Sequence, residues 1–581
     1  MNMCGIFGYT GLTEHTDLLK NMGELLSHRG PDDVGYYTKN ESCIHFGLRR
    51  LSIIDLAGGH QPIANEDQNI WVACNGEIYN YIELRRELVK NGHKFKTLSD
   101  VEVLVHLYEE QGLGFLDDVN GMFGLVLFDV RANRLILARD RLGIKPLYYS
   151  WNGNRLTFAS EIKPILKCPW VSRDPDWEGI SSYLHIFYIP SPRTCFKDIQ
   201  KLESCTMAIL EKGLLSFRSY WDPNDFLDGH KKEDINPKDA SEHLLDLLKD
   251  SCRLQLRSDV PVGAFLSGGG DSSAVVGLVN SDKTRGMDTY TGAWKKAAEK
   301  MDERIFARQV AERYGCTHHE LLISWEDFDR LLPRLVWHLE EPNADGAYIP
   351  TYMISRFARQ KSKVILTGAG GDELFGGYGY YLRNIRPLYL LKKYFKNRLW
   401  PGLREAYVRR AFMFPWSLVF SKYRPHVAAD FLFGYDRFSG RDGLNREMAF
   451  DLKVYLQDNI LLLTDKMSMA ASIEARVPLL DHRIVEYVIG LPSSLKLNAL
   501  DKKIIFKQSV NKYLPDSILS RQKDGFGAPI TSWLQGPLKE ISQNLIERGR
   551  LIKLGIIDKR SLKRLEHLMR LRKNWGWALW V

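Results

Sequence analysis

The start of the chain carries the first residue suited to catalysis, Cys4, which stands between Met3 and Gly5. A thiolate is a strong nucleophile, but a free thiol has a pKa near ~8.5 and is mostly protonated at neutral pH without a base. If Cys4 is the first residue of the mature chain, its own α-amine, with a pKa of ~7.7–8.0, can act as that base. Buried cysteines are more often inert small hydrophobes, so the segments that follow must decide between the two interpretations.

Two glycine-rich segments suit a phosphate and a cation. Residues 267–273 (SGGGDSS) follow an apolar strand and open a helix, where free backbone N–H groups favour an anion. The segment lacks the Gly-Lys-Ser/Thr of a Walker A loop. Residues 367–378 form a second such run, and Asp271 and Asp372 are carboxylates of the kind that hold Mg²⁺ against phosphate oxygens. The alternative is that both acids only cap their helices.

Four further segments occur in order after Cys4: 28–32 (HRGPD), 50–52 (RLS), 75–80 (NGEIYN) and 99–100 (SD). With the first residues they resemble the glutaminase domain of class II amidotransferases, which has an N-terminal-nucleophile fold. The resemblance implies that Cys4 attacks the glutamine amide and that the Asn75 side chain and the Gly76 N–H form the oxyanion hole. Because Met1, Asn2 and Met3 precede Cys4, it also predicts their removal.

The same resemblance implies how glutamine is held. Arg50 offers the fork geometry that grips an α-carboxylate. Asp100 and the backbone around Glu77 are expected to hold the α-ammonium group, beside Asn75.

The glycine-rich run at 267–273 resembles the pyrophosphate loop of enzymes that cleave ATP to AMP and pyrophosphate, although Gly270 stands where a larger apolar residue is usual. The resemblance places the ATP contacts on Leu266, Ser267, Gly268, Gly269, Asp271, Ser272, Ser273, Thr367 and Gly368, and Mg²⁺ on Asp271 and Asp372. Residues 502–507 match a segment whose lysine stabilises the adenylation transition state, and that role falls on Lys503.

Residues 465–470, 474–481 and 521–533 extend the similarity, so nearly the whole chain resembles the glutamine-hydrolysing asparagine synthetase family. The resemblance implies that ATP activates aspartate as an acyl-adenylate, which ammonia from the first domain attacks after crossing a shielded passage. That family usually carries Glu where this chain has Ala369. A different carboxylate acceptor, from surface polysaccharide or secondary metabolism, therefore stays open. A tRNA-modifying enzyme and a storage protein are further alternatives.

The elements that must position these residues change in character along the chain. Before residue 200 the sequence favours strands and hairpins, such as 123–130 with 135–139 and the pair around Asn152-Gly153, and one clear helix, Tyr81–Lys90. After residue 240, the predicted strands 261–266, 289–294, 320–323 and 363–367 alternate with helices at 272–280 and 304–314. This alternation indicates a parallel sheet covered on both faces.

The predicted fold class is α/β, and the resemblance implies an N-terminal-nucleophile-type α/β/β/α glutaminase domain, 1–212, and a parallel α/β pyrophosphate-loop synthetase domain, 241–581. The polar segment 213–240 is predicted to be their linker. Residues 380–440 and 548–573 are basic, and we interpret both as helical surfaces. His318 and His319 are adjacent in a predicted strand, so they point to opposite faces and cannot easily share one metal ion.

The composition is that of a globular protein: of 581 residues, 44% are hydrophobic and 26% charged. No run approaches the ~18 apolar residues of a membrane span, and the eight scattered cysteines fit reduced thiols, so a cytoplasmic location is expected. The net charge of +9 does not distinguish ATP from nucleic acid or a membrane. The expected partners are glutamine, aspartate and ATP, without nucleic acid or membrane. A homodimer is compatible with the sequence, which does not decide the oligomeric state.

Overall fold

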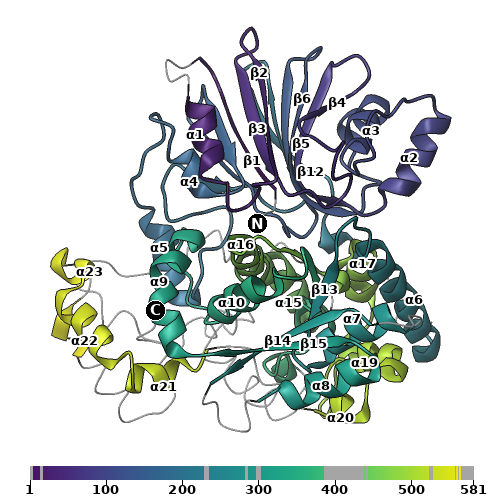
Figure 1. Cartoon of the computed structure of the whole chain (residues 1–581), viewed down its shortest axis with the longest axis vertical. Helices are drawn as coiled ribbons and strands as arrows, with labels where there is room; N and C mark the ends of the chain where they lie inside the picture. The colour runs from purple at the N-terminus through teal and green to yellow at the C-terminus, as the bar shows by residue number, and fades with distance from the viewer. Residues whose placement is uncertain are drawn as a thin grey trace, which may run out of the picture.

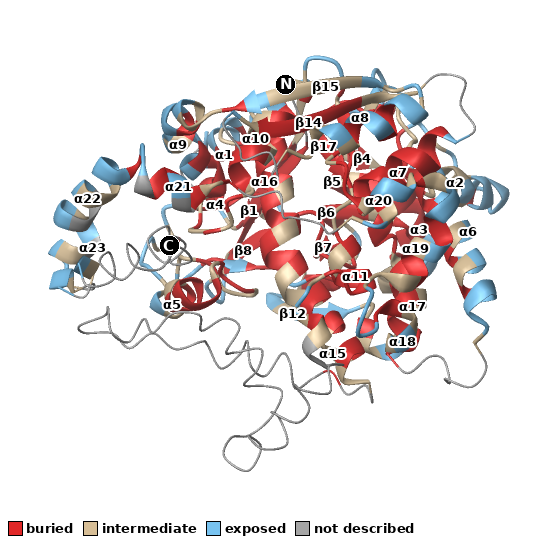
Figure 2. Ribbon diagram, turned by 90° about the horizontal axis from the view of Figure 1, so that it is seen from below, coloured by how far each residue is buried: buried red, intermediate tan, exposed pale blue. Residues whose placement is uncertain are grey.

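The computed structural model describes residues 4–12, 17–227, 235–281, 286–295, 302–384, 438, 442–521, 528–555, 558–560 and 562–563. The strands of the N-terminal half lie above a second α/β unit that begins with helix α6 (Pro237–Gln255), as Figure 1 shows. Buried residues run through the middle of both parts, whereas α22 (Lys539–Arg548) and α23 (Arg550–Lys553) lie at the periphery (Figure 2). Among the described helices, none combines the length and apolar character needed to cross a bilayer.

Within the described residues, the N-terminal part contains two six-stranded sheets, and their strand pairs are antiparallel. The first sheet has the order β10-β8-β9-β1-β3-β2: Gln200–Lys201, Tyr148–Trp151, Leu156–Ala159, Gly5–Thr10, Ile44–Arg50 and Asp33–Lys39. The second has the order β12-β11-β7-β6-β5-β4: Leu214–Ser219, Thr206–Glu211, Arg134–Arg139, Gly121–Asp129, Ile70–Ile78 and Ile63–Ala64.

Successive side chains of each strand point to opposite faces of its sheet. One face of each sheet therefore packs against the other sheet and the opposite face packs against helices, which gives four layers. Ile6 points into the core between the sheets, and its neighbour Phe7 packs on the outer side against α1 (Leu18–Glu24) and α4 (Ile162–Ile165). On the outer face of the second sheet lie α2 (Tyr81–Lys90) and α3 (Val103–Gln111). This α/β/β/α arrangement confirms the predicted N-terminal fold, and the helix expected at 81–90 has those bounds.

The C-terminal part is built on a five-stranded parallel sheet, as predicted, with the order β15-β14-β13-β16-β17 among the described residues. These strands are Thr317–Ile323, Asp288–Trp294, Val262–Phe265, Val364–Leu366 and Glu474–Arg476. One face packs against α6, α7 (Gly270–Asn280) and α8 (Arg304–Arg313), and α10 (Tyr348–Ala358) covers the other. Both faces are therefore covered, which fits the apolar sequences of the inner strands β13 and β16.

The remaining helices complete the two parts. The described ones are α5 (Trp177–Ile186), α9 (Trp325–Leu339), α11 (Gly371–Phe375), α15 (Gly443–Asp451), a π-helix at Leu452–Leu461, α16 (Leu462–Ala470), α17 (His482–Gly490), α18 (Ser493–Lys496), α19 (Ile504–Val510), α20 (Asp516–Leu519) and α21 (Ile530–Gln535). The basic segments 380–440 and 548–573 lie largely outside the described residues.

The predicted linker, 213–240, needs a correction at both ends. Its first residues form β12, which pairs with β11 across a turn at Lys212 and Gly213, both with positive φ. Its last residues start α6, capped by the side chain of Asn236. Because β12 is an edge strand whose side chains are mostly exposed, its sequence lacks the apolar alternation of a half-buried strand.

Buried ion pairs hold the two parts together. The Arg29 guanidinium lies 2.8 Å from the Asp465 carboxylate of α16 and 3.1 Å from Glu161. Lys145 adds a contact of 3.4 Å to Asp465, and Lys163 lies 2.9 Å from Glu340. The segments around 140 and 160 therefore belong to this interface.

Replacing Arg29 by methionine is expected to destabilise the protein by about 3–5 kcal/mol, since two buried carboxylates lose their cation. Thermal unfolding followed by circular dichroism measures the effect. Arg330→Met, which removes an exposed pair with Asp327, is the control and is expected to change stability little. Equal unfolding temperatures for the two variants would show that the buried pairs contribute nothing.

Candidate active sites

Cys4 lies immediately before β1 and is buried at the junction of the first sheet with the turn after β3. Its Sγ accepts a hydrogen bond from the Leu51 N–H at 3.4 Å, and Arg29 donates to its carbonyl oxygen at 3.1 Å. Burial raises the pKa of the Cys4 thiol to about 12, although the Leu51 backbone and Arg50 act in the opposite direction. The thiol therefore needs a nearby base to become a nucleophile. Residues 1–3 lie outside the described residues, so the role of the α-amine stays a prediction.

The two residues predicted for the oxyanion hole lie next to each other on β5. Asn75 is fully buried, and its Nδ2 donates to Ser160 Oγ at 3.3 Å, while that hydroxyl accepts from the Ile6 N–H at 3.0 Å. Asn75 is thus tied to β1, two residues from Cys4. At Gly76 any Cβ would lie 1.9 Å from the Met122 carbonyl oxygen, and φ is +155°, so only glycine fits.

The predicted glutamine contacts lie around this centre. Arg50 is buried, and its Nη2 donates to the carbonyl oxygens of Ile54 and Asp55 at 2.9 and 2.7 Å. Asp100 accepts from the Ile78 N–H at 2.7 Å, and burial raises its pKa to about 6. Burial, with Glu474 and Asp100 nearby, also raises the pKa of Glu77 well above its ordinary value. A buried acidic pair of this kind attracts a cation such as an α-ammonium group.

Sequence reasoning assigned no role to Arg476, which reaches this acidic pair from the other domain. Its Nη2 lies 3.4 Å from Glu77, and its Nε donates to Glu474 at 2.6 Å. Its own carbonyl oxygen accepts from the N–H of Thr367, the residue that opens the second glycine-rich run, at 2.9 Å. One residue of β17 therefore touches both candidate sites.

The first glycine-rich run forms the turn between β13 and α7. Gly268 has φ +72°, and a Cβ there would lie 2.8 Å from the Ala307 nitrogen. Ser267 and Ser272 are joined through their hydroxyls at 3.1 Å. Ser273 Oγ is fully buried and has no hydrogen-bond partner among the described residues. The turn thus offers amides and a hydroxyl at a helix N-terminus, as an anion site requires.

The second run touches the first. A Cβ at Gly368 would lie 2.5 Å from the Ser272 nitrogen, and one at Gly371 would lie 2.7 Å from the Asp271 carboxyl carbon. Leu266, at the end of the strand, is fully buried and donates its N–H to Tyr290 at 2.9 Å. The predicted ATP residues are therefore brought together at the carboxyl ends of β13 and β16, where ligands of open α/β sheets bind.

Lys503 joins the acids of the two runs. Its Nζ lies 2.7 Å from both carboxylate oxygens of Asp271 and 2.6 Å from Asp372 Oδ1. It stands at the start of α19 with a left-handed φ of +56°. Arg521 approaches the same turn and donates to the Gly268 carbonyl oxygen at 3.3 Å. Ala369 presents no carboxylate here.

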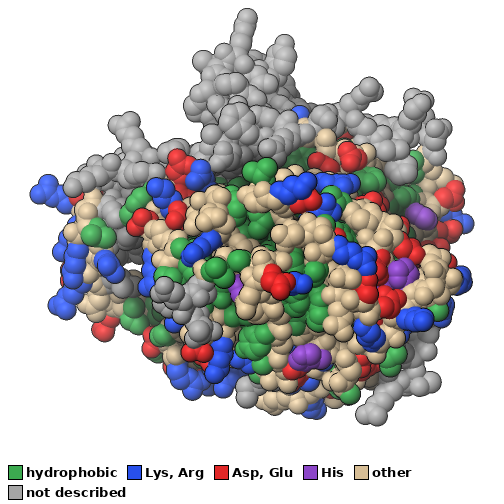
Figure 3. Space-filling view, turned by 90° about the horizontal axis from the view of Figure 1, so that it is seen from above, with side chains coloured by type: hydrophobic (Ala, Val, Ile, Leu, Met, Phe, Trp, Pro, Cys, Tyr) green, Lys and Arg blue, Asp and Glu red, His purple; other side chains and the backbone are tan. Residues whose placement is uncertain are grey.

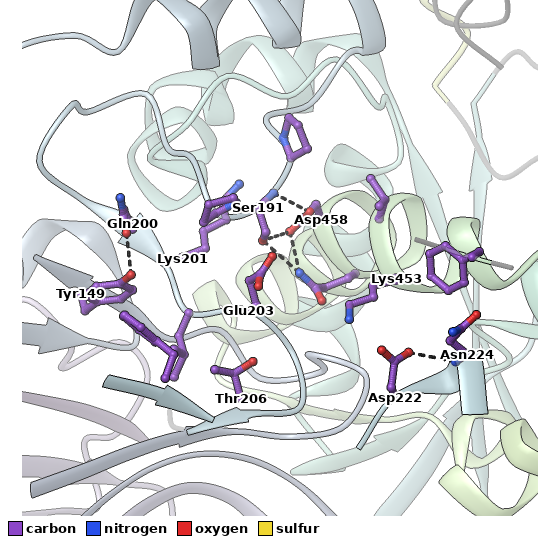
Figure 4. A pocket seen from close by; sticks show the side chains of 17 residues that line it. Tyr149, Ser191, Gln200, Lys201, Glu203, Thr206, Asp222, Asn224, Lys453 and Asp458 are labelled. Atoms are coloured by element: carbon purple, nitrogen blue, oxygen red, sulfur yellow. Dashed lines mark hydrogen bonds between the residues drawn. The ribbon is translucent and has the colours of Figure 1, made fainter. Parts of the chain in front are cut away.

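A cavity of about 630 Å³ lies elsewhere between the domains (Figure 4). In Figure 4 Ser191 faces Asp458, whose carboxylate accepts from the Ser191 N–H and Oγ at 2.7 and 2.6 Å. Tyr149 and Lys453 line it from the two sides. The residues predicted to bind glutamine or ATP are not among those that line it, and the sequence carried no signal for it.

Two protein-family models match the chain, and the division between them falls between β12 and the body of α6. Residues 3–221 match the model of the glutamine amidotransferase domain, and residues 243–581 match that of asparagine synthase. The chain belongs to the asparagine synthase family. Asparagine synthases are ATP-dependent ligases, so the chain is an enzyme of this class with a glutamine amidotransferase domain attached.

Its relatives in the family are similar over most of their length. Asparagine synthetase (glutamine-hydrolyzing) 1 of Bacillus subtilis is 32% identical, over 94% of this chain and 90% of that protein. Asparagine synthetase (glutamine-hydrolyzing) 2 of the same organism is 34% identical, over 90% of this chain and 72% of that protein. Amidase chry2 of Gibberella zeae is 28% identical, over 92% and 88%.

Proposed function

We propose that the chain synthesises asparagine from aspartate, with glutamine as the nitrogen donor. The thiolate of Cys4 attacks the side-chain amide of glutamine, ammonia leaves, and water hydrolyses the thioester to glutamate. ATP transfers AMP to the aspartate side-chain carboxylate and releases pyrophosphate. Ammonia then displaces AMP to give asparagine. The observation that carries the proposal is the convergence of Lys503 on two acids beside an anion-binding turn, in a chain that also has a glutamine amidotransferase domain.

In the glutaminase centre the protein's contribution is orientation. Asn75 and Gly76 stabilise the oxyanion of the tetrahedral intermediate, and Arg50 holds the α-carboxylate. Asp100 and Glu77 are buried, and burial raises the pKa of both carboxyl groups although Arg476 acts in the opposite direction. The substrate's ammonium group adds the positive charge that favours their ionised forms.

At the ATP centre, Asp271 and Asp372 suit a Mg²⁺ ion, because hard cations prefer carboxylate oxygens. Both carboxylates approach the same point, which the Lys503 ammonium group occupies in this structure. When bound, Mg²⁺ neutralises charge on the triphosphate. The N–H groups of 268–273 and the hydroxyls of Ser267, Ser272 and Ser273 contact the pyrophosphate. Lys503 supplies positive charge as charge develops in adenylation.

The second candidate function is amidation of another carboxylate. It is favoured by Ala369. The similar family usually carries Glu at this position, in the turn that carries Asp372, and the resemblance implies that this acid assists the attack of ammonia. A small residue at this point also leaves room for an acceptor larger than aspartate.

A cytoplasmic location fits the free thiols of all eight cysteines. On the face seen in Figure 3, acidic and basic side chains are interspersed, which favours small-molecule substrates over nucleic acid for that face. Glutamine, aspartate and ATP are the proposed substrates, and a homodimer is compatible with the proposal. The working division is a glutaminase domain from 1 to the end of β12 and a synthetase domain from 241 to 581.

Pyrophosphate release, measured with ATP, Mg²⁺, glutamine and one carboxylic acid at a time, tests the proposal. Asparagine and AMP in equal amounts, dependent on aspartate, are expected, and ammonium salts should replace glutamine. Pyrophosphate that ignores aspartate but responds to another acid would establish the second candidate. Failure to release pyrophosphate with any acid, together with RNA retained on the protein, would overturn both.

A further inference from the structure

Four side chains with metal-binding atoms meet on the outer side of the glutaminase domain: Glu66, His93, His106 and Glu109. Each offers one ligand atom, and these atoms all lie within 4.8 Å of one another. Figure 1 places the nearby helices α2 and α3 at the edge of the molecule, beyond the second sheet. None of the four belongs to the sites described above.

Three separate elements bring the group together. Glu66 lies in the turn between β4 and β5, and His93 follows α2 after Gly92, which has φ +101°. His106 and Glu109 stand one turn apart on α3 and so share a face of that helix. Only this last spacing is visible in the sequence.

The distances between the ligand atoms suit a four-coordinate ion. His106 Nδ1 lies 3.2 Å from Glu109 Oε2 and 3.5 Å from Glu66 Oε2. His93 Nδ1 lies 3.6 Å from Glu109 Oε2 and 3.8 Å from Glu66 Oε1. Zinc bonds of ~2.0–2.1 Å in a tetrahedron separate neighbouring ligand atoms by about 3.3–3.4 Å. Small side-chain movements therefore bring all four onto one centre.

An outer partner orients one of the two imidazoles. His93 Nε2 lies 3.2 Å from Glu110 Oε1, which also accepts from Asn91. His93 thus turns Nδ1 to the cluster and Nε2 to a carboxylate, the arrangement in which a second carboxylate sets the tautomer of a metal-bound histidine. His106 Nε2 lies 3.9 Å from Glu102 Oε1, too far for a hydrogen bond, and has no hydrogen-bond partner among the described residues.

The carboxylates are held as well. Glu66 Oε1 accepts from the Lys94 N–H at 2.7 Å, and Glu109 Oε1 accepts from Asn65 Nδ2 at 2.8 Å. His106 is fully buried, with its ring 4.5 Å from that of Phe95.

We propose that Glu66, His93, His106 and Glu109 form a structural site for a divalent transition metal, with Zn²⁺ the best match. Two imidazoles and two carboxylates are borderline donors that suit Zn²⁺ in tetrahedral geometry. Four protein ligands leave no open position, which is typical of structural rather than catalytic zinc. The ion joins the turn before β5 to α3. Because His93 and His106 are both ligands, it also fixes the two ends of the segment 93–106, which carries Asp100.

The test uses the full-length protein, stripped with EDTA, desalted and loaded with Zn²⁺ or Co²⁺ alone. His93→Gln and Glu109→Gln each remove one ligand from a partly exposed position, whereas His106 is too buried to substitute safely. His60→Gln is the matched control, because His60 lies in the same domain but pairs with Asp33. Near-ultraviolet circular dichroism checks that each variant is folded.

Wild type and His60→Gln are expected to retain one more equivalent of Zn²⁺ after desalting than either ligand variant, with at least tenfold tighter binding. Co²⁺ should give tetrahedral bands without thiolate charge transfer, which distinguishes this site from cysteines. Zn²⁺ should raise the unfolding temperature of wild type but not of His93→Gln. Equal metal retention in wild type and a folded ligand variant would overturn the proposal, as would Co²⁺ bound only through thiolate.

Discussion

Cys4→Ala is expected to abolish synthesis from glutamine while leaving synthesis from ammonium salts near the wild-type rate. The thiol is the only group proposed to bond to the glutamine amide, and removing a nucleophile of this kind costs on the order of a thousandfold or more. The ammonia-dependent reaction uses Lys503, Asp271 and Asp372, which the substitution does not touch. Glutamate and pyrophosphate, measured separately with each nitrogen source, give the result.

The matched control is Cys74→Ala. Cys74 is also a fully buried thiol of the same domain, and burial likewise raises its pKa well above the ordinary range. Both activities should survive there. Glutamine-dependent synthesis by Cys4→Ala would refute the glutaminase mechanism.

Mass spectrometry of the purified wild-type protein adds an independent check, because the base proposed for Cys4 exists only if its amine is free. The mature chain is expected to begin at Cys4. An active protein that still carries Met1 would exclude the α-amine as the base and require another group to take the thiol proton.

The elements with strong periodicity could be predicted from the sequence. Helix 81–90 has a polar and an apolar side, and β6 and β7 are apolar runs separated by a short polar turn, so both patterns indicated their structures correctly. The parallel sheet followed from strands alternating with helices. β12 was missed because an exposed edge strand needs no apolar alternation, and the polar residues 222–237 that follow it were interpreted as a linker that begins at 213.

Some residues of the candidate sites could also be predicted from the sequence, and others could not. Asp271 and Asp372 could be, because they stand in glycine-rich runs that are recognisable in the sequence. Arg476 could not be singled out, because its importance comes from the packing of β17 between two sites. The four residues of the proposed metal site are spread over separate elements, and only the spacing of His106 and Glu109 hinted at a shared surface.

Arg476 also suggests why the domains stay in one chain. Its side chain balances the acids where the glutamine ammonium group is proposed to bind, and its backbone holds the strand that leads to Asp372. In the proposed complex the ammonium group of glutamine brings a positive charge to Glu77 and thereby changes the charge balance around Arg476. The same residue is positioned to report this change to the ATP turn, since Thr367 donates to its carbonyl oxygen.

Lys503→Met is expected to stop both glutamine- and ammonia-dependent synthesis while glutamine hydrolysis continues. The ammonium group lies within 2.7 Å of Asp271 and within 2.6 Å of Asp372, so it occupies the point where the phosphates of ATP and their cation are proposed to meet. Removing one preorganised charge from such a centre costs about a hundred- to a thousandfold in rate. Pyrophosphate release at saturating ATP, with glutamate formation recorded in the same sample, separates the two activities.

Lys507→Met is the control for this substitution. Lys507 lies on the same helix one turn later, is partly exposed, and pairs with Asp501 at 2.5 Å. It loses the same charge and gains the same side chain, but at a point away from the two acids, so its pyrophosphate release should stay close to wild type. If both variants slowed equally, the effect would come from the stability of α19 or from net charge. If neither slowed, Lys503 would only balance Asp271 and Asp372 in the free enzyme. The charge that stabilises adenylation would then have to come from another residue, such as Arg521, which is hydrogen-bonded to the Gly268 carbonyl oxygen.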